Sequence, residues 1–313
     1  MQGLRKEGFI LERLKGIAMI IFGSMFWGAT GPMMEWMLDE TAMTADFMLA
    51  IRLIIAGIFI LSIIAMQKKS IFSIWKSKYW STQLIIFSLV GMAGLQYTFV
   101  KSIEVSNAII ATLLQFLAPI FIIVYTSIIF KAFPARSQVI GITGTLFGLF
   151  LLLTNGSVSN LLVSGEALIW GLFLGFTYAF YTLYPARLMA EVGVIVIIGW
   201  GMIVSGLIFT VKAQLWKSDE WGLLLDPNIV LLIISMSIFG SLAYILFLTS
   251  LKYITPVETS ILSSFEPLTT MAISVVWLGS ILYKWQYFGI LLMLLFITYL
   301  SIAGTKKPNS TNV

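Results

Sequence analysis

The chain contains neither cysteine nor histidine, and only 11% of its 313 residues are charged. Without cysteine there is no disulfide framework, thiol nucleophile or thiolate metal site. Without histidine, the commonest general base and the usual zinc ligand are missing. An ordinary soluble domain carries about 25% charged and about 45–50% apolar residues, whereas 59% of this chain is hydrophobic. The composition therefore excludes a soluble globular protein and a disordered one, and we expect no resident metal or cofactor.

Long hydrophobic runs fill almost the whole chain. A helix needs roughly 20 apolar residues to cross a hydrocarbon core of about 30 Å, whereas barrel strands are about 10 residues long and alternate apolar with polar. The runs here are longer and apolar all round, so they predict an all-α integral membrane protein. We expect ten transmembrane helices, at residues 14–38, 44–66, 80–101, 105–130, 136–154, 164–190, 192–212, 229–251, 255–280 and 283–304.

Lysine and arginine are unevenly distributed between the loops that join these runs. With the N-terminus placed in the cytoplasm, fourteen of the 19 basic residues lie in inner loops and tails, four lie outside, and Arg52 lies within a run. Cytoplasmic loops are typically rich in basic residues. This bias predicts a multi-pass protein of the cell membrane with both termini in the cytoplasm. The net charge of +5 then reflects membrane orientation rather than affinity for nucleic acid.

The chain also resembles itself when it is shifted by 148 residues. Four identities result, namely Ser102 with Ser250, Pro119 with Pro267, Gln138 with Gln286, and Gly141 with Gly289. Half of ten spans is five, an odd number, so a second copy of a five-span unit must enter the membrane the opposite way round. We therefore predict a 5+5 inverted repeat of residues 1–154 and 155–304, followed by a disordered cytoplasmic tail at 305–313. The alternative is a duplication that only builds a stable bundle.

Several short motifs occur in an order typical of one transporter family. They are FWGATGP followed by Arg52, NAIIATLLQFLAPIF, Gln138–Gly141, FEP, and Gln286–Gly289. With these motifs the chain resembles the EamA family of the drug/metabolite transporter superfamily over nearly its whole length. The resemblance implies a ten-helix inverted repeat that moves small metabolites, often amino acids and frequently outward. The family usually has a glutamate six residues before each of the two glutamines, and here those positions are Ala132 and Ser280.

Three charged residues stand within or beside apolar runs. A charge at the bilayer centre costs about 2.5–3.5 kcal/mol on insertion scales, so such residues are functional candidates by default. Glu266 lies near the middle of the ninth run, where it could attract a cationic group, carry a proton, or hydrogen-bond a neighbouring helix. Arg52 lies within the second run and Glu35 near its outer end, which predicts an intramembrane ion pair; a carboxylate-binding Arg52 is the alternative.

Two prolines occupy equivalent positions in the fourth and ninth runs. Pro119 and Pro267 lack an N–H group, so each leaves the carbonyl four residues earlier, that of Gln115 or Ser263, without its helical partner. A carbonyl freed in this way must find another partner or line a wet cavity. We expect both prolines to act as helix hinges beside a central site; a kink needed only for packing is the alternative.

Amides, hydroxyls and aromatic rings near the middle of other runs are the candidate lining of a solute pathway. Most aromatic residues within a membrane serve packing, but this combination of side chains suits a small amphiphilic solute. The candidates are Trp27, Gln96, Gln115, Tyr178, Tyr244 and Ser263, together with Glu266.

These observations predict a secondary transporter of small metabolites, an amino-acid-like solute exporter that works by alternating access around a midplane pocket. No GxxxxGK[ST] motif is present, so we expect an ion or solute gradient, with a proton at Glu266 as the candidate, to drive it. The expected partners are a small-molecule solute and the lipid bilayer, and no oligomeric state is indicated. The alternatives are a carrier of cationic or quaternary ammonium solutes and a non-transporting scaffold or sensor subunit. An enzyme is disfavoured because no nucleophile–base pair is visible.

Overall fold

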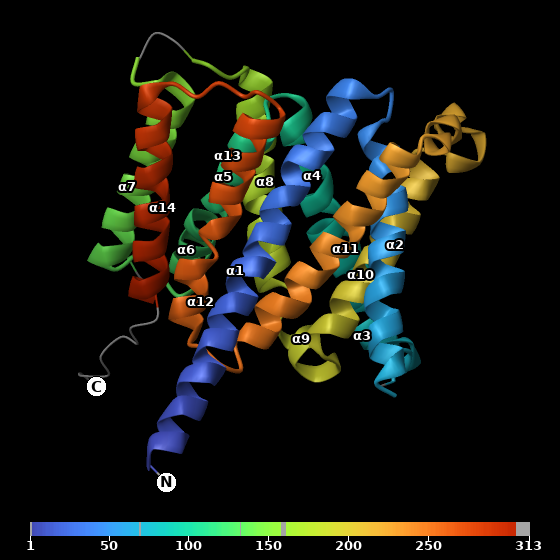
Figure 1. Ribbon diagram of the computed structural model, residues 1–313, viewed down its shortest axis with the longest axis horizontal. Coiled ribbons are helices and arrows are strands. Elements are labelled where there is room, and N and C mark those ends of the chain that lie inside the picture. Colours follow the sequence, from blue (N-terminus) through green and yellow to red (C-terminus); the bar gives the residue numbers. More distant parts are fainter. Residues whose placement is uncertain (1, 69, 132, 158–160, 305–313) are drawn as a thin grey trace.

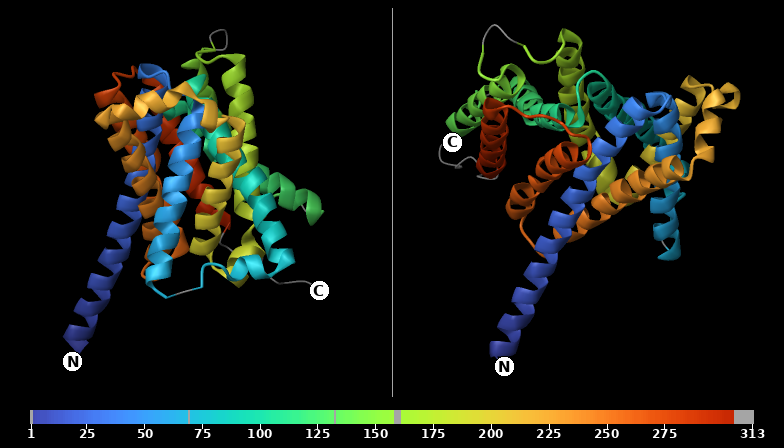
Figure 2. Two further views of the ribbon diagram at one scale, coloured as in Figure 1. Left: turned by 90° about the vertical axis from the view of Figure 1, so that its right-hand side faces the viewer. Right: turned by 45° about the horizontal axis from the view of Figure 1, so that its top comes forward.

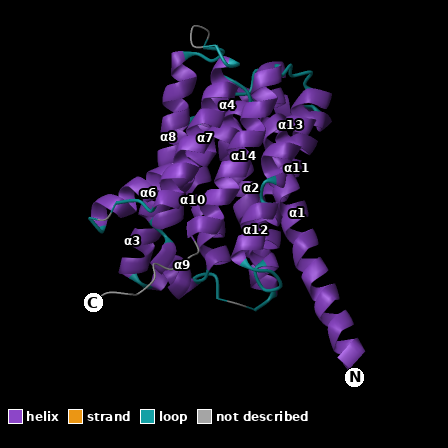
Figure 3. Ribbon diagram, turned by 90° about the vertical axis from the view of Figure 1, so that its left-hand side faces the viewer, coloured by secondary structure: helices purple, strands orange, loops and turns teal. Residues whose placement is uncertain are grey.

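The computed structural model describes residues 2–68, 70–131, 133–157 and 161–304. Within these ranges the chain forms helices joined by turns and loops, and no strand (Figures 1 and 3). The expected tail at 305–313 lies outside the described residues. The α-helices are α1 (Gln2–Glu40), α2 (Ala45–Met66), α3 (Lys78–Ile86), α4 (Gly94–Glu104), α5 (Ala108–Leu114), α6 (Ala118–Ile129), α7 (Arg136–Thr154), α8 (Gly165–Leu183), α9 (Ala186–Val192), α10 (Val194–Lys212), α11 (Pro227–Ser250), α12 (Pro256–Leu262), α13 (Phe265–Trp277) and α14 (Lys284–Gly304).

Eight helical segments of the described chain, rather than ten, are long and apolar enough to cross a membrane. They correspond to the first eight predicted runs. The ninth run is present as two helices, α12 and α13, because the chain turns at Ser263 and Ser264. The tenth run is α14, which spans 21 residues and is counted as an apolar helix over its described part, Lys284–Leu300. The prediction of ten full-length spans is therefore met in part.

The helices lie side by side, and the start of α1 and the end of α14 are at the same end of the bundle (Figures 1 and 2). We call this end the terminal face. The other end, which we call the opposite face, carries the turn between α1 and α2 and the short 3₁₀ helix η5 (Asp219–Leu225).

Small residues allow two pairs of helices to pack closely. Helix α2 packs against α10, and α7 packs against α14. A Cβ atom added at Gly57 in α2 would lie 2.8 Å from the carbonyl oxygen of Gly199 in α10. One added at Gly289 in α14 would lie 2.6 Å from the carbonyl oxygen of Gly148 in α7. Glycine at these crossings therefore lets the backbones approach, as small residues do between membrane helices.

Several helix bounds recur 148 residues apart. Helices α5 and α12 begin and end with this separation, at Ala108–Leu114 and Pro256–Leu262. Helices α6 and α13 end with the same separation, and α7 and α14 begin with it. The same shift places α2 on α10 and α7 on α14. In each of the two most closely packed helix pairs, the two members are therefore equivalent positions of the repeat.

Both helices that contain the paired prolines are interrupted just before the proline. The 3₁₀ turn η3 (Gln115–Leu117) separates α5 from α6, and a turn separates α12 from α13. The N–H group of Ala118 donates to the carbonyl of Gln115, and that of Glu266 donates to the carbonyl of Ser263 at 3.0 Å. The carbonyls that Pro119 and Pro267 leave free are thus satisfied by the residue before each proline.

Candidate functional site

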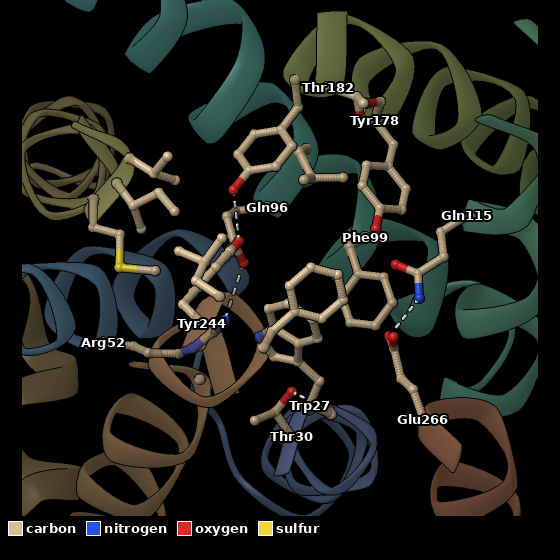
Figure 4. Close-up of a pocket in the computed structure, with 18 of the residues that line it drawn as sticks. Trp27, Thr30, Arg52, Gln96, Phe99, Gln115, Tyr178, Thr182, Tyr244 and Glu266 are labelled. Atoms are coloured by element: carbon tan, nitrogen blue, oxygen red, sulfur yellow. Dashed lines mark hydrogen bonds between the residues drawn. The ribbon is translucent and has the colours of Figure 1, made fainter. Parts of the chain in front are cut away.

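A cavity of about 360 Å³ lies between the helices, on the side of α1 that faces α4, α8 and α11 (Figure 4). Its lining extends from Met34, near the end of α1 at the opposite face, to Met189 in α9 at the terminal face. It is lined by Trp27, Thr30, Met34, Arg52, Leu95, Gln96, Phe99, Gln115, Tyr178, Tyr181, Thr182, Met189, Val194, Ile198, Met202, Gly240, Tyr244, Phe247, Leu248 and Glu266.

Arg52 brings a buried positive charge to this cavity. Its side chain projects from α2 and the residue is only 6% exposed. One guanidinium nitrogen, Nη1, donates to Oε1 of Gln96 at 3.2 Å and lies 3.7 Å from the sulfur of Met34. Among the described residues, no carboxylate pairs with this guanidinium. Most of its five N–H donors are therefore available to a ligand in the cavity.

The described structure contains no ion pair between Arg52 and Glu35. Glu35 instead accepts a hydrogen bond at 2.7 Å from the backbone N–H of Ala108, the first residue of α5. The buried carboxyl satisfies one of the free N–H groups that every helix has at its start. Glu35 does not line the cavity, and it joins α1 to α5 rather than to α2.

Glu266 lies across the cavity from Arg52 (Figure 4). It is partly buried in the first turn of α13, and its Oε1 accepts a hydrogen bond at 2.6 Å from the side-chain amide of Gln115. This bond links the interruption between α5 and α6 to the one between α12 and α13. Among the described residues, the other carboxyl oxygen of Glu266 accepts no hydrogen bond, so it can interact with a ligand in the cavity.

Aromatic side chains form the wall between these two polar groups. The rings of Trp27 and Tyr244 meet edge to face with centroids 4.8 Å apart. The hydroxyl of Tyr181 donates to that of Tyr244 at 2.9 Å, and the ring of Tyr178 lies 6.2 Å from that of Tyr181. Aromatic rings offer apolar contact and, on their faces, attraction for a cation.

The structure brings together six of the seven predicted pathway residues. Trp27, Gln96, Gln115, Tyr178, Tyr244 and Glu266 all line the cavity. The seventh, Ser263, is not among the lining residues. Its backbone carbonyl accepts a hydrogen bond from the backbone N–H group of Glu266. Pro267 directly follows the lining residue Glu266, and Pro119 lies four residues after the lining residue Gln115.

Sequence reasoning missed several lining residues. Tyr181 follows Tyr178 by three residues and therefore shares its helix face, so helical periodicity could have identified it. Thr30 stands in the same relation to Trp27. The apolar lining residues Met34, Met189 and Met202 carry no signal that distinguishes them from packing residues.

The polar groups of the cavity stand on opposite sides of it. A cation stands on one side, a carboxyl group on the other, and aromatic and methionine side chains lie between them. A solute with separated positive and negative groups could satisfy both polar ends. Methionine is flexible and polarisable, so this part of the wall can adapt to apolar groups of different shape.

Comparison with known proteins gives consistent matches. The model of the EamA-like transporter family matches the chain twice, over residues 14–154 and 165–302. The inner membrane transporter YicL of Salmonella typhimurium is 32% identical over 297 residues, which cover 95% of this chain and 98% of YicL. The transporter YwfM of Bacillus subtilis is 25% identical over 297 residues, covering 93% and 95% of the two chains. One crystal structure shares the fold, with a TM-score of 0.59, 13% identity, and coverage of 95% of this chain and 97% of the other.

The family match and the eight apolar helices agree on a multi-pass membrane protein with a transport role. Both matched segments contain helices that line the cavity. The protein belongs to the EamA-like transporter family.

Proposed function

We propose that this protein is a secondary transporter of zwitterionic, amino-acid-like solutes, which it exports by alternating access. The solute occupies the cavity with its carboxylate at Arg52 and its ammonium group at Glu266. Its remaining part lies against the aromatic and methionine side chains between them.

The observation that carries this proposal is the buried guanidinium of Arg52. A buried charge without a counter-ion is costly, and breaking a buried pair by removing one partner typically costs about 3–5 kcal/mol. Arg52 is 6% exposed and has an amide and a sulfur atom, but no described carboxylate, as partners. A carboxylate supplied by the solute would complete the site, with two parallel N–H···O bonds to the planar guanidinium.

Glu266 supports a zwitterion over a simple anion. It places a carboxyl oxygen on the far side of the same cavity, and Gln115 holds it there. A purely anionic solute would face this carboxyl group, and a purely cationic one would face Arg52. The volume of about 360 Å³ lies at the lower end of the range of about 300–1,000 Å³ that is typical of small-molecule sites.

For the transport cycle we propose two inverted five-helix units, residues 1–154 and 155–304, with both termini in the cytoplasm. The recurrence of helix bounds after 148 residues supports such a repeat. The position of both described chain ends at one face is what an even number of crossings requires. The interruptions before Pro119 and Pro267 are the proposed hinges, since irregular backbone beside a cavity is common in transporters built from inverted repeats.

The test compares three forms of one solute: an amino acid, its decarboxylated amine, and its deaminated carboxylic acid. Binding to the purified protein is measured by calorimetry, or by the rise in melting temperature that a bound ligand produces. We expect the amino acid to bind tightest to the wild type. In Arg52→Gln the amino acid should bind no better than the amine, and in Glu266→Gln no better than the acid.

Two variants serve as controls, because each removes a charge outside the cavity that has the same sign as the charge of Arg52 or of Glu266. Arg187→Gln removes an arginine that lies over the ring of Trp80, and Glu104→Gln removes the partner of Lys101. Both should preserve the wild-type preference for the amino acid. If Arg52→Gln keeps the same preference for the amino acid over the amine, the proposed carboxylate site does not exist.

A carrier of cationic solutes is the second candidate, because Trp27, Tyr178 and Tyr244 place three aromatic rings on the cavity that also contains Glu266. Each cation–π contact can contribute about 0.5–2 kcal/mol. Tight binding of choline-like solutes that survives in Arg52→Gln, with no binding of amino acids to the wild type, would favour this function. The guanidinium in the same cavity argues against it.

A further inference from the structure

One segment of α1 lies beside the cavity and is bound to both α5 and α13. We infer that Gly28–Glu35 is the gate between the cavity and the opposite face, and that Glu35 is its latch. The inference rests on the proposed transport function, because a gate has a role only if solute must pass between the cavity and the opposite face. Its gating contacts involve Gly28, Gly31, Pro32 and Glu35, which do not line the cavity, whereas Thr30 and Met34 of the same segment do.

At the inner end of the segment, α1 is in backbone contact with α13. A Cβ atom added at Gly28 would lie 2.3 Å from the carbonyl oxygen of Glu266. Pro32 lies inside α1 and has no N–H group, so it leaves the carbonyl of Gly28 without its helical partner. The hydroxyl of Thr270 in α13 donates to this carbonyl at 2.9 Å. The proline of α1 therefore creates an acceptor that binds α13.

At the outer end, the same segment is bound to α5. A Cβ atom added at Gly31 would lie 3.3 Å from Cβ of Ala108 and 3.7 Å from the hydroxyl of Thr112. One turn further on, the carboxyl of Glu35 accepts from the backbone N–H of Ala108 at 2.7 Å. Glu35 is 8% exposed, so this bond is shielded from water. Beyond it, the rings of Trp36 in α1 and Trp277 in α13 stack with centroids 6.1 Å apart.

These contacts join α1 to both interrupted helices, the elements proposed to hinge. The cavity lining includes Met189 of α9 as well as Thr30 and Met34 of this segment, and we place the junction of α1, α5 and α13 between the cavity and the opposite face. For the cavity to open there, α5 must part from α1 and the Glu35–Ala108 bond must break. The backbone of Glu266 is in close contact with Gly28, so the proposed solute-binding residue belongs to the helix turn of α13 that the inner end of the gate contacts.

The test uses the absence of cysteine from the chain. Thr30→Cys places one thiol in the cavity at the gate, and a membrane-impermeant maleimide is applied to either face in right-side-out and inside-out vesicles. Glu35→Ala removes the acceptor of the Ala108 N–H. Hydrogen bonds to charged groups stabilise by about 1.5–3 kcal/mol, so labelling from the opposite face should become about tenfold faster or more.

Two matched variants separate the latch from a general effect of lost charge. Glu35→Gln keeps an oxygen acceptor for the Ala108 N–H, so labelling should accelerate far less than in Glu35→Ala. Glu40→Ala removes an exposed acid at the end of the same helix and should change nothing. Equal labelling rates in Glu35→Ala and Glu40→Ala would overturn the inference. Thr182→Cys, on the cavity wall, should still be labelled from the terminal face in every folded variant.

A second measurement covers the case in which Glu35→Ala destabilises the protein. Cysteines introduced at Trp36 and Trp277 are joined by a short bifunctional thiol reagent. The cross-linking yield in Glu35→Gln should be slightly lower than in the parent. In Glu40→Ala it should equal the parent yield, as the labelling rate should. An unchanged yield in both would contradict a gate at this position. Both measurements are made without solute, so a wrong solute assignment leaves the gate test intact, and a failed gate leaves the solute proposal intact.

Discussion

The residues of the FWGATGP segment illustrate how small side chains and one proline shape a single helix. Proline inside a helix usually kinks or ends it, because its ring clashes with the preceding turn and it lacks a donor. Helix α1 nevertheless continues past Pro32 to Glu40. The carbonyl of Gly28, which Pro32 cannot satisfy, is taken by Thr270 from a neighbouring helix. The hydrogen bond that α1 lacks at Gly28 is therefore replaced by a hydrogen bond between α1 and α13.

Gly28→Ala is expected to destabilise the protein. Its added methyl group would meet the backbone oxygen of Glu266, which cannot rotate away as a side chain could. Overpacking of this kind costs about 1–3 kcal/mol, so the melting temperature in detergent should fall. Gly165→Ala is the matched control, since a Cβ atom at Gly165 has no neighbour within 4 Å. Equal melting temperatures for the two variants would show that α1 and α13 separate at little cost.

At the residue scale, the sequence identified the charged groups that are costly to bury in a membrane, but not their hydrogen-bond partners. Arg52 and Glu266 are recognisable because charges within apolar runs are rare. Nothing in the spacing of Arg52 and Glu35 revealed that the carboxyl would bind the start of α5 instead, because that contact depends on how α1, α2 and α5 pack. Local chemistry is readable from sequence, whereas the choice among several nearby partners is decided by tertiary packing.

Among the helices, the paired glutamines show how one capping device serves both halves of the chain. Oε1 of Gln138 accepts from the backbone N–H of Ala135 at 2.9 Å, just before α7. Oε1 of Gln286 accepts from the N–H of Tyr283 at 3.0 Å, just before α14. Each side chain thus satisfies an N–H group at the start of its helix. The sequence repeat identified both residues, and the structure shows why glutamine suits both positions.

The two caps should differ in their contribution to stability. Gln286 is 5% exposed and its amide also donates to the carbonyl of Leu152 at 3.0 Å, whereas Gln138 is half-buried and only caps. Gln138→Ala should cost about 1 kcal/mol, as lost caps typically do. Gln286→Ala should cost about 2–3 kcal/mol, because it also leaves a buried carbonyl without its partner. Thermal unfolding of both variants checks this order, and an equal loss would mean that the Leu152 bond contributes nothing.

The interrupted helices also separate what was predictable from what was not. The two prolines predicted distortion at equivalent places in the fourth and ninth runs, and both helices are interrupted there. The length of the interruption was not predictable. It depends on whether the N–H of the preceding residue can reach the freed carbonyl, as those of Ala118 and Glu266 do. Ten apolar runs were counted, and the turn at Ser263 divides the ninth of them into two shorter helices.

Across the whole molecule, the cavity collects side chains that are far apart in the chain. Arg52 and Gln96 come from the first half, and Tyr244 and Glu266 from the second. Gln96 and Tyr244 are 148 residues apart, so the same position in each half supplies a lining residue with different chemistry. The two halves therefore build an asymmetric site, with a guanidinium on one side and a carboxyl group on the other. Such asymmetry would orient the zwitterionic solute that we propose, which two identical half-sites could not do.

Glu266 also stands where a proton could be exchanged for the solute, because it lies in the cavity and beside the gate segment. We expect Glu266→Gln to lose solute accumulation driven by a pH gradient, since glutamine cannot take up and release a proton. Exchange of labelled for unlabelled solute should continue at saturating concentrations, because exchange needs no proton movement. Both rates are measured in proteoliposomes that contain the purified protein.

Glu104→Gln provides the control for this coupling prediction. It also removes one carboxylate from a helix end, but its partner Lys101 and its exposed position place it outside the cavity. It should retain both exchange and gradient-driven accumulation. If Glu266→Gln still accumulates solute in response to a pH gradient, the coupling group lies elsewhere, and Glu266 serves only to hold the solute and its neighbour Gln115. If exchange fails as well, even at saturation, Glu266 is needed for the movement of the loaded carrier rather than for its coupling to protons.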